Sequence, residues 1–319
     1  MPAWDVEAVA RALRAENFGR VERQASLARF TAARVGGRAD LLLTVRAAEQ
    51  LGAAAAWLWA QGVPFRVLGG GSNVLVADEG VREVVVLNRA AQVEFREAPS
   101  GPTVWAESGA SLGGVARRAA DRGLTGLEWA GTIPGTIGGA VVGNAGAFGG
   151  EIAACLQAAE ILQPARSAET WPAERLAYRY RASWLKDHPG RAIVLSATLR
   201  LQPGDRQACR RRLADHRQER QRTQPFGPSW GSMFKNPPGD HAGRLIEAAG
   251  LKGAQRGGAQ ISALHANFFV NLGGATAADV WELIELARGE VARKFGVELE
   301  LEVERIGEWS GSAGLEGRG

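Results

Sequence analysis

The sequence predicts an α+β protein in two portions, the first ending near residue 202 and the second starting near residue 203. Short apolar runs typical of strands occur beside segments of helical periodicity in both portions. The sequence Pro203-Gly204-Asp205 marks the boundary, because proline and glycine end regular structure. Glycine is also unevenly spread, since 18 of the 42 glycines lie between residues 69 and 150.

The first portion is expected to mix helices and short strands. The N-terminal 19 residues predict an amphipathic helix, and a strand at 41–45 precedes a helix at 47–61. Ser111 is suited to cap a helix that ends near residue 121. Residues 126–150 lack periodicity and are expected to be irregular. Further strands are expected at 65–68, 74–77, 84–87, 93–95, 103–107, 159–162 and 192–201.

The second portion is expected to begin with a long charged helix, which Asp205 caps and which runs to about residue 222. An irregular segment follows at 223–240. The tail at 308–319 is rich in glycine and serine and is predicted to be disordered. The remaining elements are helices at 243–249 and 277–295 and strands at 267–271 and 297–306.

The composition describes a folded chain with little net charge. Hydrophobic residues make up 45% of the chain and the net charge is +4, which excludes pervasive disorder and a polycation. Collagen is excluded because glycine shows no three-residue period. The N-terminus lacks a signal-peptide pattern, and the longest apolar stretch, residues 52–60, is far shorter than the ~20 residues of a membrane span. We therefore expect a cytoplasmic protein that binds neither membrane nor nucleic acid.

Cysteine and lysine are both scarce. Two cysteines provide neither a disulfide framework nor a metal quartet, and H-E-x-x-H and C-x-x-C motifs are absent, so no metal site is predicted. Only four of the 38 basic residues are lysines, which makes each of them a candidate for a special role: Lys186, Lys235, Lys252 and Lys294.

Two glycine-rich stretches are the strongest candidates for a cofactor site. The first joins two predicted strands, and its glycines allow an anion-binding nest, although an ordinary tight turn remains open. It is neither a Rossmann fingerprint nor a P-loop. The second is too long for a hairpin and suggests a ligand against the main chain, with tight backbone packing as the alternative. The candidates are Gly69, Gly70, Gly71, Ser72 and Asn73, then Gly131, Thr132, Ile133, Pro134, Gly135, Ile137, Gly138, Gly139, Asn144 and Gly146.

Two further motifs have competing interpretations. Residues 109–113 match the G-x-S-x-G nucleophile elbow of serine hydrolases, but an N-cap at Ser111 explains the same serine more simply. The helix at 205–222 carries seven arginines, which suggests nucleic-acid binding. Acidic residues interrupt this run and no aromatic residue is interleaved, so a solvated helix face is favoured.

Three polar clusters remain, at residues 178–183, 231–237 and 297–303. Each alone is typical of an exposed surface element, yet together they offer a cation, a hydroxyl, an amine and a carboxylate. In the third cluster the alternation places Glu298, Glu300 and Glu302 on one face of the predicted strand.

With these motifs in this order, the chain resembles the UDP-N-acetylenolpyruvoylglucosamine reductase family, flavoenzymes of peptidoglycan precursor synthesis, from about residue 30 to residue 306. The resemblance implies an FAD-binding domain of the vanillyl-alcohol-oxidase type at 1–202, made of two α+β subdomains at about 1–88 and 89–202. A substrate-binding α+β domain follows at 203–307. The cofactors implied are FAD, reduced by NADPH. Because neither glycine-rich stretch contains histidine or cysteine, we expect the flavin to be non-covalent.

The resemblance also assigns roles to residues. It implies that the protein converts UDP-N-acetylglucosamine enolpyruvate, its UDP-sugar enolpyruvyl ether substrate, to UDP-N-acetylmuramate, with no obligatory protein partner. Ser232 is the implied proton donor and Arg181 and Glu302 its catalytic companions, because a guanidinium fork suits a carboxylate and a positioned hydroxyl suits proton transfer. The implied substrate-binding residues are Tyr180, Lys235, Asn236 and His265. An FAD-linked oxidase of the same fold and a G-x-S-x-G hydrolase remain as alternatives.

The chain departs from the family pattern in three places. Both tyrosines, Tyr178 and Tyr180, lie in the arginine motif, so the loop that places a tyrosine over the substrate in one branch is absent. The chain therefore resembles the shorter branch. Leu264 stands where many members have lysine, and Phe148 stands where tyrosine is common.

Overall fold

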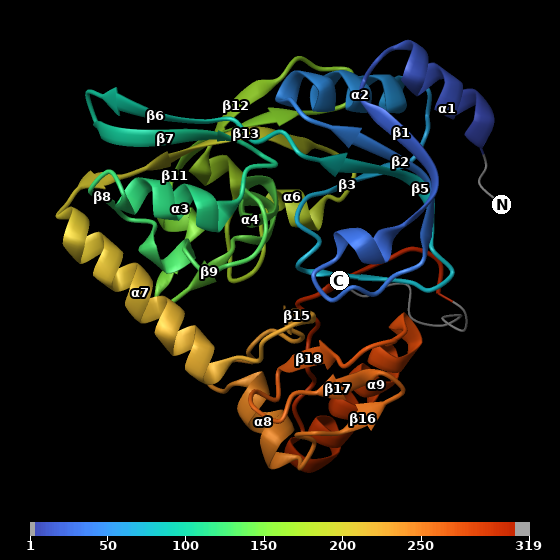
Figure 1. Ribbon diagram of the computed structural model, residues 1–319, viewed down its shortest axis with the longest axis vertical. Helices are drawn as coiled ribbons and strands as arrows, with labels where there is room; N and C mark the ends of the chain where they lie inside the picture. The colour runs from blue at the N-terminus through green and yellow to red at the C-terminus, as the bar shows by residue number, and fades with distance from the viewer. Residues whose placement is uncertain (1–3, 310–319) are drawn as a thin grey trace.

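The computed structural model describes residues 4–309, in which three sheets of four or five strands, with their helices, form the main parts and three strand pairs complete the fold (Figure 1). The α+β class predicted from the sequence is confirmed. In the first sheet the strand order is β1-β2-β5-β3, with β2, β5 and β3 parallel and β1 antiparallel. Its elements are α1 (Val6–Ala15), β1 (Arg20–Ser26), the 3-10 turn Leu27–Phe30, β2 (Arg38–Val45), α2 (Ala48–Ala60), β3 (Phe65–Leu68) and β5 (Val81–Asn88).

The apolar run in β2 reflects burial on both faces of this sheet. Leu41 and Leu43 pack with α1 and α2, whereas Leu42 packs into a separate cluster on the opposite face. Strands covered on both faces read as continuous apolar runs, so the sequence signal for β2 is strong. Strand β1, Arg-Val-Glu-Arg-Gln-Ala-Ser, lies at the sheet edge and is largely exposed, which explains why no strand was predicted there.

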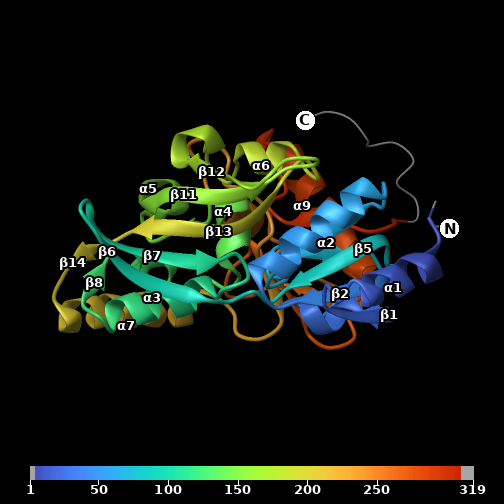
Figure 2. The same ribbon diagram turned by 90° about the horizontal axis from the view of Figure 1, so that it is seen from above.

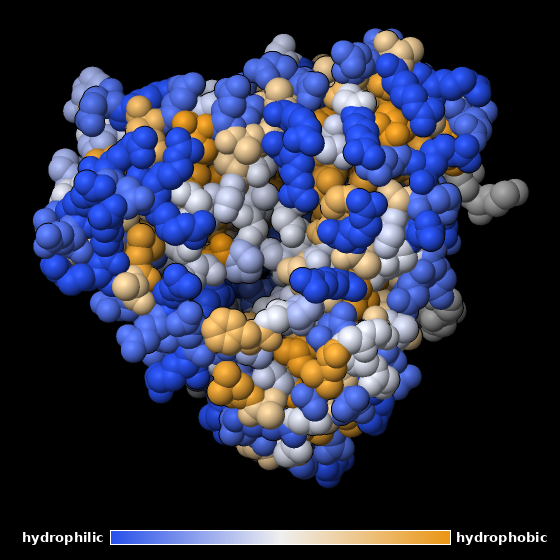
Figure 3. Space-filling model, viewed as in Figure 1, coloured by the Kyte–Doolittle hydropathy of each residue, from blue (hydrophilic) through white to orange (hydrophobic). Residues whose placement is uncertain are grey.

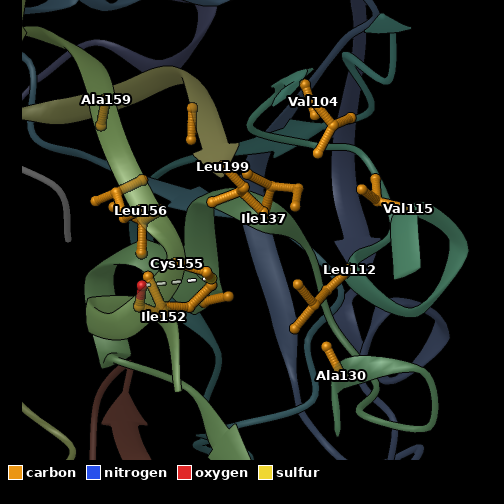
Figure 4. Close-up of a cluster of buried hydrophobic side chains, with 14 of the residues drawn as sticks. Val104, Leu112, Val115, Ala130, Ile137, Ile152, Cys155, Leu156, Ala159 and Leu199 are labelled. Carbon is orange, nitrogen blue, oxygen red and sulfur yellow. Dashed lines mark hydrogen bonds between the residues drawn. The ribbon is translucent and has the colours of Figure 1, made fainter. Parts of the chain in front are cut away.

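The second sheet is antiparallel, with strand order β12-β11-β13-β7-β6. Val104, Ile137, Leu156 and Leu199 from its strands and helices meet in one buried cluster (Figure 4). The strands of this sheet are β6 (Val93–Ala98), β7 (Gly101–Glu107), β11 (Leu156–Leu162), β12 (Glu169–Pro172) and β13 (Ile193–Arg200). The same stretch of chain contains helices α3 (Leu112–Ala120), α4 (Ile137–Gly143), α5 (Ile152–Cys155) and α6 (Trp184–Asp187), with 3-10 turns at Glu128–Ala130 and Ala173–Leu176. It also contains two separate strand pairs, β8 (Leu124–Thr125) with β14 (Gln202–Pro203) and β9 (Gly146–Ala147) with β10 (Gly150–Glu151).

The irregular structure expected at 126–150 is wrong in part, because this stretch contains helix α4. The Thr136 hydroxyl caps α4 by accepting a hydrogen bond from the Gly139 N–H over 3.4 Å. Glycine disfavours helices, and the sequence of α4, Ile-Gly-Gly-Ala-Val-Val-Gly, gives no helical propensity signal. Packing of Ile137 and Val141 in the buried cluster stabilises this helix instead.

Helix α7 (Arg206–Thr223) connects the second sheet to the C-terminal part and lies beside α3 (Figure 2). Asp205 caps α7 as predicted, accepting from the Ala208 N–H over 2.7 Å. The C-terminal sheet has the order β15-β18-β17-β16. Its elements are β15 (Ser229–Ser232), α8 (Ala242–Ala248), β16 (Gln255–Arg256), β17 (Ala259–Ile261), β18 (Phe268–Asn271) and α9 (Ala277–Phe295).

The strand predicted at 297–306 is wrong over most of its length, since β19 spans only Glu304–Ile306. β19 pairs in parallel with β4 (Val74–Val76), which directly follows the first glycine-rich loop. The expected common face of three glutamates is therefore not formed: Glu298 and Glu300 are exposed, whereas the Glu302 side chain is 18% exposed. The predicted tail begins with Glu308, whose N–H donates to the Gly80 carbonyl over 3.0 Å, and its residues 310–319 lie outside the described part.

Among residues 4–309, no helix has both the length and the apolar character needed to cross a bilayer. Cys155 and Cys209 are both free and buried.

Candidate active site

A cavity of about 380 Å³ opens where the second sheet, α7 and the C-terminal part meet. The space-filling view shows the surface hollowed between the upper and lower parts of the molecule (Figure 3). Both predicted glycine-rich stretches, the end of α7 and the strand that carries Ser232 contribute to the lining. These segments supply Ser72, Thr132, Pro134, Arg220, Ser229 and Gly231, among others.

The two glycine-rich stretches pack against each other beside this cavity. A Cβ atom added to Gly70 would lie 2.9 Å from the Gly135 Cα, and one added to Gly69 would lie 2.4 Å from the Thr136 Oγ1. The Ser72 hydroxyl donates to the Pro134 carbonyl over 3.2 Å. Close backbone packing therefore accounts for Gly69 and Gly70, and it joins the two stretches into a single surface.

This surface presents hydrogen-bond donors and cations. Within residues 4–309, the main-chain N–H groups of Gly70 and Ser72 meet no acceptor. On the second stretch, Arg117 donates to the Gly131 carbonyl over 2.8 Å, and Arg220 donates to the Thr132 carbonyl. Burial lowers the pKa of Arg220, yet the guanidinium remains charged at neutral pH. Free N–H groups beside guanidinium groups suit a diphosphate, so these residues fit the FAD that the sequence predicts.

Some predicted cofactor-binding residues pack closely against other parts of the protein. Ile137 is fully buried in the core of the second sheet. A Cβ on Gly138 would lie 2.8 Å from the Ser108 Cβ, and one on Gly131 would lie 2.2 Å from the Leu213 Cδ2. Tight packing therefore explains why small or apolar residues occupy these three positions, and their contact with the cofactor stays a prediction.

The side-chain amide of Asn144, another predicted cofactor-binding residue, makes its hydrogen bonds inside the fold. Asn144 is 1% exposed. Its Nδ2 donates to the Arg179 carbonyl over 3.0 Å and to the Glu151 carboxylate over 3.2 Å, and its Oδ1 accepts from the Ala153 N–H over 3.0 Å. Asn144 thus fixes the turn at the end of α4 next to Arg181.

Arg181 and Glu302, from segments 121 residues apart, form an ion pair at the side of the site. The Arg181 Nε donates to the Glu302 Oε1 over 2.9 Å. The other two nitrogens donate to main-chain carbonyls, Nη1 to Asn144 over 3.3 Å and Nη2 to Gly146 over 2.7 Å. The side chains are 21% and 18% exposed. Since a guanidinium has five N–H groups, this arrangement fixes Arg181 and leaves two donors for a ligand.

The Glu302 carboxyl has a shifted protonation equilibrium. Burial raises the pKa of Glu302, and the charges of Arg181, Lys186 and Lys235 oppose this shift. The main chain of Glu302 is held on both sides: its N–H donates to the Met233 carbonyl over 2.9 Å, and its carbonyl accepts from the Asn73 Nδ2 over 3.0 Å. The first glycine-rich loop and the strand of Ser232 therefore meet at this glutamate.

Ser232 and Lys235 flank Met233 in the sequence, and the Met233 carbonyl is the group that accepts the hydrogen bond from the Glu302 N–H. Ser232 ends β15, and its hydroxyl has no hydrogen-bond partner among residues 4–309. Lys235 forms an ion pair with Glu300, and its N–H donates to the Glu300 carbonyl over 2.8 Å. The structure thus brings the hydroxyl, amine, cation and carboxylate of the three predicted polar clusters into one region.

The other three predicted substrate-binding residues, Asn236, His265 and Tyr180, make contacts unlike those of Lys235. The Asn236 Oδ1 accepts from the Ala242 N–H over 3.1 Å at the start of α8, and the His265 Nδ1 accepts from the Asn267 N–H over 3.2 Å. Burial lowers the pKa of His265. In the described residues, neither side chain bonds to the Arg181–Glu302 pair. The Tyr180 ring is half exposed, and the Arg181 guanidinium lies 5.2 Å from its centre.

Sequence reasoning named Lys186 as one of four scarce lysines but gave it no place in the site, where its Nζ donates to the Arg181 carbonyl over 3.1 Å. The signal was available, because Lys186 is one of only four lysines and directly follows the arginine motif. Sequence reasoning also missed the role of Arg220. The arginines of α7 were expected to face solvent, but the Arg220 side chain donates to the Thr132 carbonyl of the second glycine-rich stretch.

The serine-hydrolase alternative loses its nucleophile. Ser111 caps α3, and its Oγ accepts from the Gly114 N–H over 3.2 Å. None of the four histidines bonds to this hydroxyl in the part of the chain that the structure describes. The N-cap interpretation of Ser111 is therefore confirmed.

Comparisons with known proteins agree with this geometry. Residues 39–166 match an FAD binding domain, and residues 221–306 match the UDP-N-acetylenolpyruvoylglucosamine reductase, C-terminal domain. The UDP-N-acetylenolpyruvoylglucosamine reductase of Rubrobacter xylanophilus is 49% identical over 88% of this chain and 94% of its own. That of Chloroflexus aurantiacus is 46% identical over 88% and 95%. The crystal structure of the Thermus caldophilus reductase superposes with a TM-score of 0.77 at 39% identity, covering 90% of this chain and 99% of its own. The chain therefore belongs to the UDP-N-acetylenolpyruvoylglucosamine reductase family.

Proposed function

We propose that the protein is an NADPH-dependent, FAD-containing reductase that converts UDP-N-acetylglucosamine enolpyruvate to UDP-N-acetylmuramate in the cytoplasm. The observation that carries this proposal is the partly buried Arg181–Glu302 ion pair, because the Glu302 N–H donates to the Met233 carbonyl directly after Ser232. Gly231, on the other side of Ser232, lines the cavity together with Arg220. The family and its FAD-binding match supply the reaction class. FAD, when bound without a covalent link, accepts a hydride from NADPH and supplies it to the substrate.

Arg181 is suited to hold the enolpyruvyl carboxylate. Three of its N–H groups are used by Glu302, Asn144 and Gly146, which fixes the plane of the guanidinium. The two remaining donors can bind the substrate carboxylate. When the terminal CH2 carbon of the enolpyruvyl group receives a hydride, negative charge develops on the carbon that bears this carboxylate and spreads into it. A fixed cation that needs no reorganisation stabilises such charge where it develops.

Glu302 is suited to act as a hydrogen-bonding acid at the same carboxylate. Because burial raises the pKa of Glu302, the protonated form is more available than for an exposed glutamate. A protonated carboxyl donates a hydrogen bond that an ionised one cannot. Arg181 and Glu302 together would therefore favour the enediolate over the starting carboxylate.

Ser232 is suited to protonate the carbon that carries the negative charge. Its hydroxyl has no competing hydrogen bond in the described residues, and Met233, the next residue, binds the Glu302 main chain over 2.9 Å. A neutral hydroxyl can act as a general acid toward the strongly basic enediolate when the hydroxyl is held within hydrogen-bond distance of the carbon to be protonated. Lys235 and Tyr180, at the margins of the site, are proposed to bind the UDP-sugar.

The experiment is an anaerobic titration of the purified protein, followed by flavin absorbance. We expect a yellow protein that NADPH bleaches, and we expect UDP-N-acetylglucosamine enolpyruvate to restore the colour with formation of UDP-N-acetylmuramate. A protein without flavin would contradict the proposal. Bleaching by an alcohol or sugar, with no response to NADPH, would instead favour the FAD-linked oxidase.

A further inference from the structure

Lys186 is a half-buried lysine in the charged region around Arg181, and the proposed reaction leaves it without a role. It lies in α6, where its own N–H donates to the Ser183 Oγ over 3.2 Å. Its ammonium group reaches back and donates to the Arg181 carbonyl over 3.1 Å. Lys186 therefore contacts the main chain of the residue whose side chain pairs with Glu302.

The backbone of Arg181 needs such support. Arg181 has a φ of 54°, in the left-handed region that a non-glycine residue adopts only at a cost in free energy. The turn is closed by paired main-chain hydrogen bonds of 3.1 Å between Arg179 and Ala182. On the far side, the Ser183 Oγ donates to the Val142 carbonyl over 2.6 Å. The Lys186 ammonium group adds a charged donor to this turn, because it binds the carbonyl of Arg181 itself.

The charged groups around Lys186 already pair with other residues. Glu302 pairs with Arg181, Glu300 with Lys235, and Glu304 with Arg66. On α6 itself, Asp187 pairs with Arg179. Among residues 4–309, Lys186 has no carboxylate at ion-pair distance, so no direct ion pair offsets the cost of burying its charge.

The same neighbours define how Lys186 titrates. Burial lowers the pKa of Lys186, and repulsion from Lys235 lowers it further, whereas Glu302, Glu304 and Glu300 act in the opposite direction. A lysine in this environment loses its proton at a lower pH than an exposed lysine does. The contact with Arg181 thus weakens as the pH rises through this lowered pKa.

We propose that Lys186 is a positioning residue that acts through Arg181: its ammonium group fastens the left-handed main chain of Arg181 and so aims the guanidinium at Glu302 and at the substrate carboxylate. The inference rests on the proposed reductase function. It concerns the half-reaction that consumes the enolpyruvyl substrate and not the reduction of the flavin by NADPH.

The test measures the two half-reactions separately, by stopped flow, in Lys186→Met and Lys186→Arg. We expect Lys186→Met to keep the wild-type rate of flavin reduction by NADPH. Flavin reoxidation by the substrate should slow by about 10- to 100-fold, because the Arg181 guanidinium would no longer be oriented toward the substrate carboxylate. Lys186→Arg, which keeps a charged donor, should recover most of the reoxidation rate. It should also retain this rate at alkaline pH, where the wild type declines, because arginine keeps its proton.

Lys294→Met is the matched control. The Lys294 Nζ also donates to a main-chain carbonyl, that of Ala249 over 2.6 Å, but this more exposed lysine lies on α9 and bonds to no part of Arg181 in the described residues. Its variant should lose some thermal stability and keep both half-reactions.

Equal reoxidation rates in Lys186→Met and the wild type would overturn the inference. The same holds if Lys186→Arg shows the alkaline decline of the wild type, and this comparison decides the matter even where Lys186→Met does not fold. Failure of NADPH to bleach the wild-type flavin would instead refute the proposed function, so the two failures are distinguishable.

Discussion

The Asn73 side-chain amide donates to the main-chain carbonyl of Glu302 over 3.0 Å, across 229 positions of sequence. The Glu304 N–H returns a hydrogen bond to the Asn73 carbonyl over 3.0 Å, and β4 and β19 pair from the next residues onward. The end of the first glycine-rich loop therefore fixes the backbone of the partly buried Glu302. The loop at residues 69–73, proposed to bind the flavin, and Glu302, the proposed acid, are thus joined by direct hydrogen bonds.

This connection predicts the behaviour of Asn73→Ala. Loss of the amide should cost about 1 kcal/mol of unfolding free energy and should slow flavin reoxidation by the substrate, because Glu302 is no longer held. Thermal unfolding and stopped-flow reoxidation measure the two effects. Asn271→Ala is the control, since the Asn271 Nδ2 also donates to a distant carbonyl, that of Ala33 over 2.9 Å. A control that slows reoxidation equally would show that the effect is general loosening.

Glu128 predicts an acid-dependent loss of stability. Burial would raise the pKa of Glu128, but hydrogen bonds from Arg212, the Gly126 N–H and Thr125 outweigh it and lower the pKa to about 2. A lowered pKa contributes stability above the pKa of the unfolded chain, near 4.3, and this contribution is lost as the pH falls toward 2.

We therefore expect Glu128→Gln to destabilise the protein by about 1 to 3 kcal/mol at pH 7 and by progressively less below pH 4. Denaturant unfolding at a series of pH values measures the difference. Glu94→Gln removes an exposed partner of Arg96 and should change stability by less than about 1 kcal/mol at every pH. A Glu128→Gln difference that is independent of pH would contradict the assignment.

Ser111→Ala separates the cap from a nucleophile. Because the Ser111 Oγ accepts from the Gly114 N–H, its loss should cost about 1 kcal/mol of stability. Turnover of NADPH and the enolpyruvyl substrate should be unchanged. A folded variant without turnover would restore a chemical role to this serine.

Much of the fold was predictable because local signals agreed with tertiary packing. The boundaries of β3 and α9 match the predicted ranges, and Asp205 and Ser111 cap the predicted helices. By contrast, α4 was missed because three of its seven residues are glycine, which disfavours a helix. At 297–303 the alternating sequence was misleading, since Glu302 turns inward to Arg181.

The site was predictable in its residues but not in its connections. Arg181, Glu302 and Ser232 came from motifs, yet no motif announces that Asn73 binds the Glu302 main chain or that Lys186 binds the Arg181 carbonyl. These contacts join segments that are distant in sequence or depend on one left-handed residue. In the glycine-rich stretches, two different requirements select the same small residues: packing of one stretch on the other, and close approach of a ligand. The sequence alone therefore does not separate the glycines that serve packing from those that serve binding.

The most direct test of the proposed reaction is the anaerobic reoxidation of NADPH-reduced Ser232→Ala by UDP-N-acetylglucosamine enolpyruvate. We predict that flavin reduction by NADPH stays at the wild-type rate, while formation of UDP-N-acetylmuramate falls by ~10²- to 10⁴-fold, or about 2.7 to 5.5 kcal/mol of barrier. Equal losses in both half-reactions, or none in the second, would contradict the role of Ser232 as the proton donor.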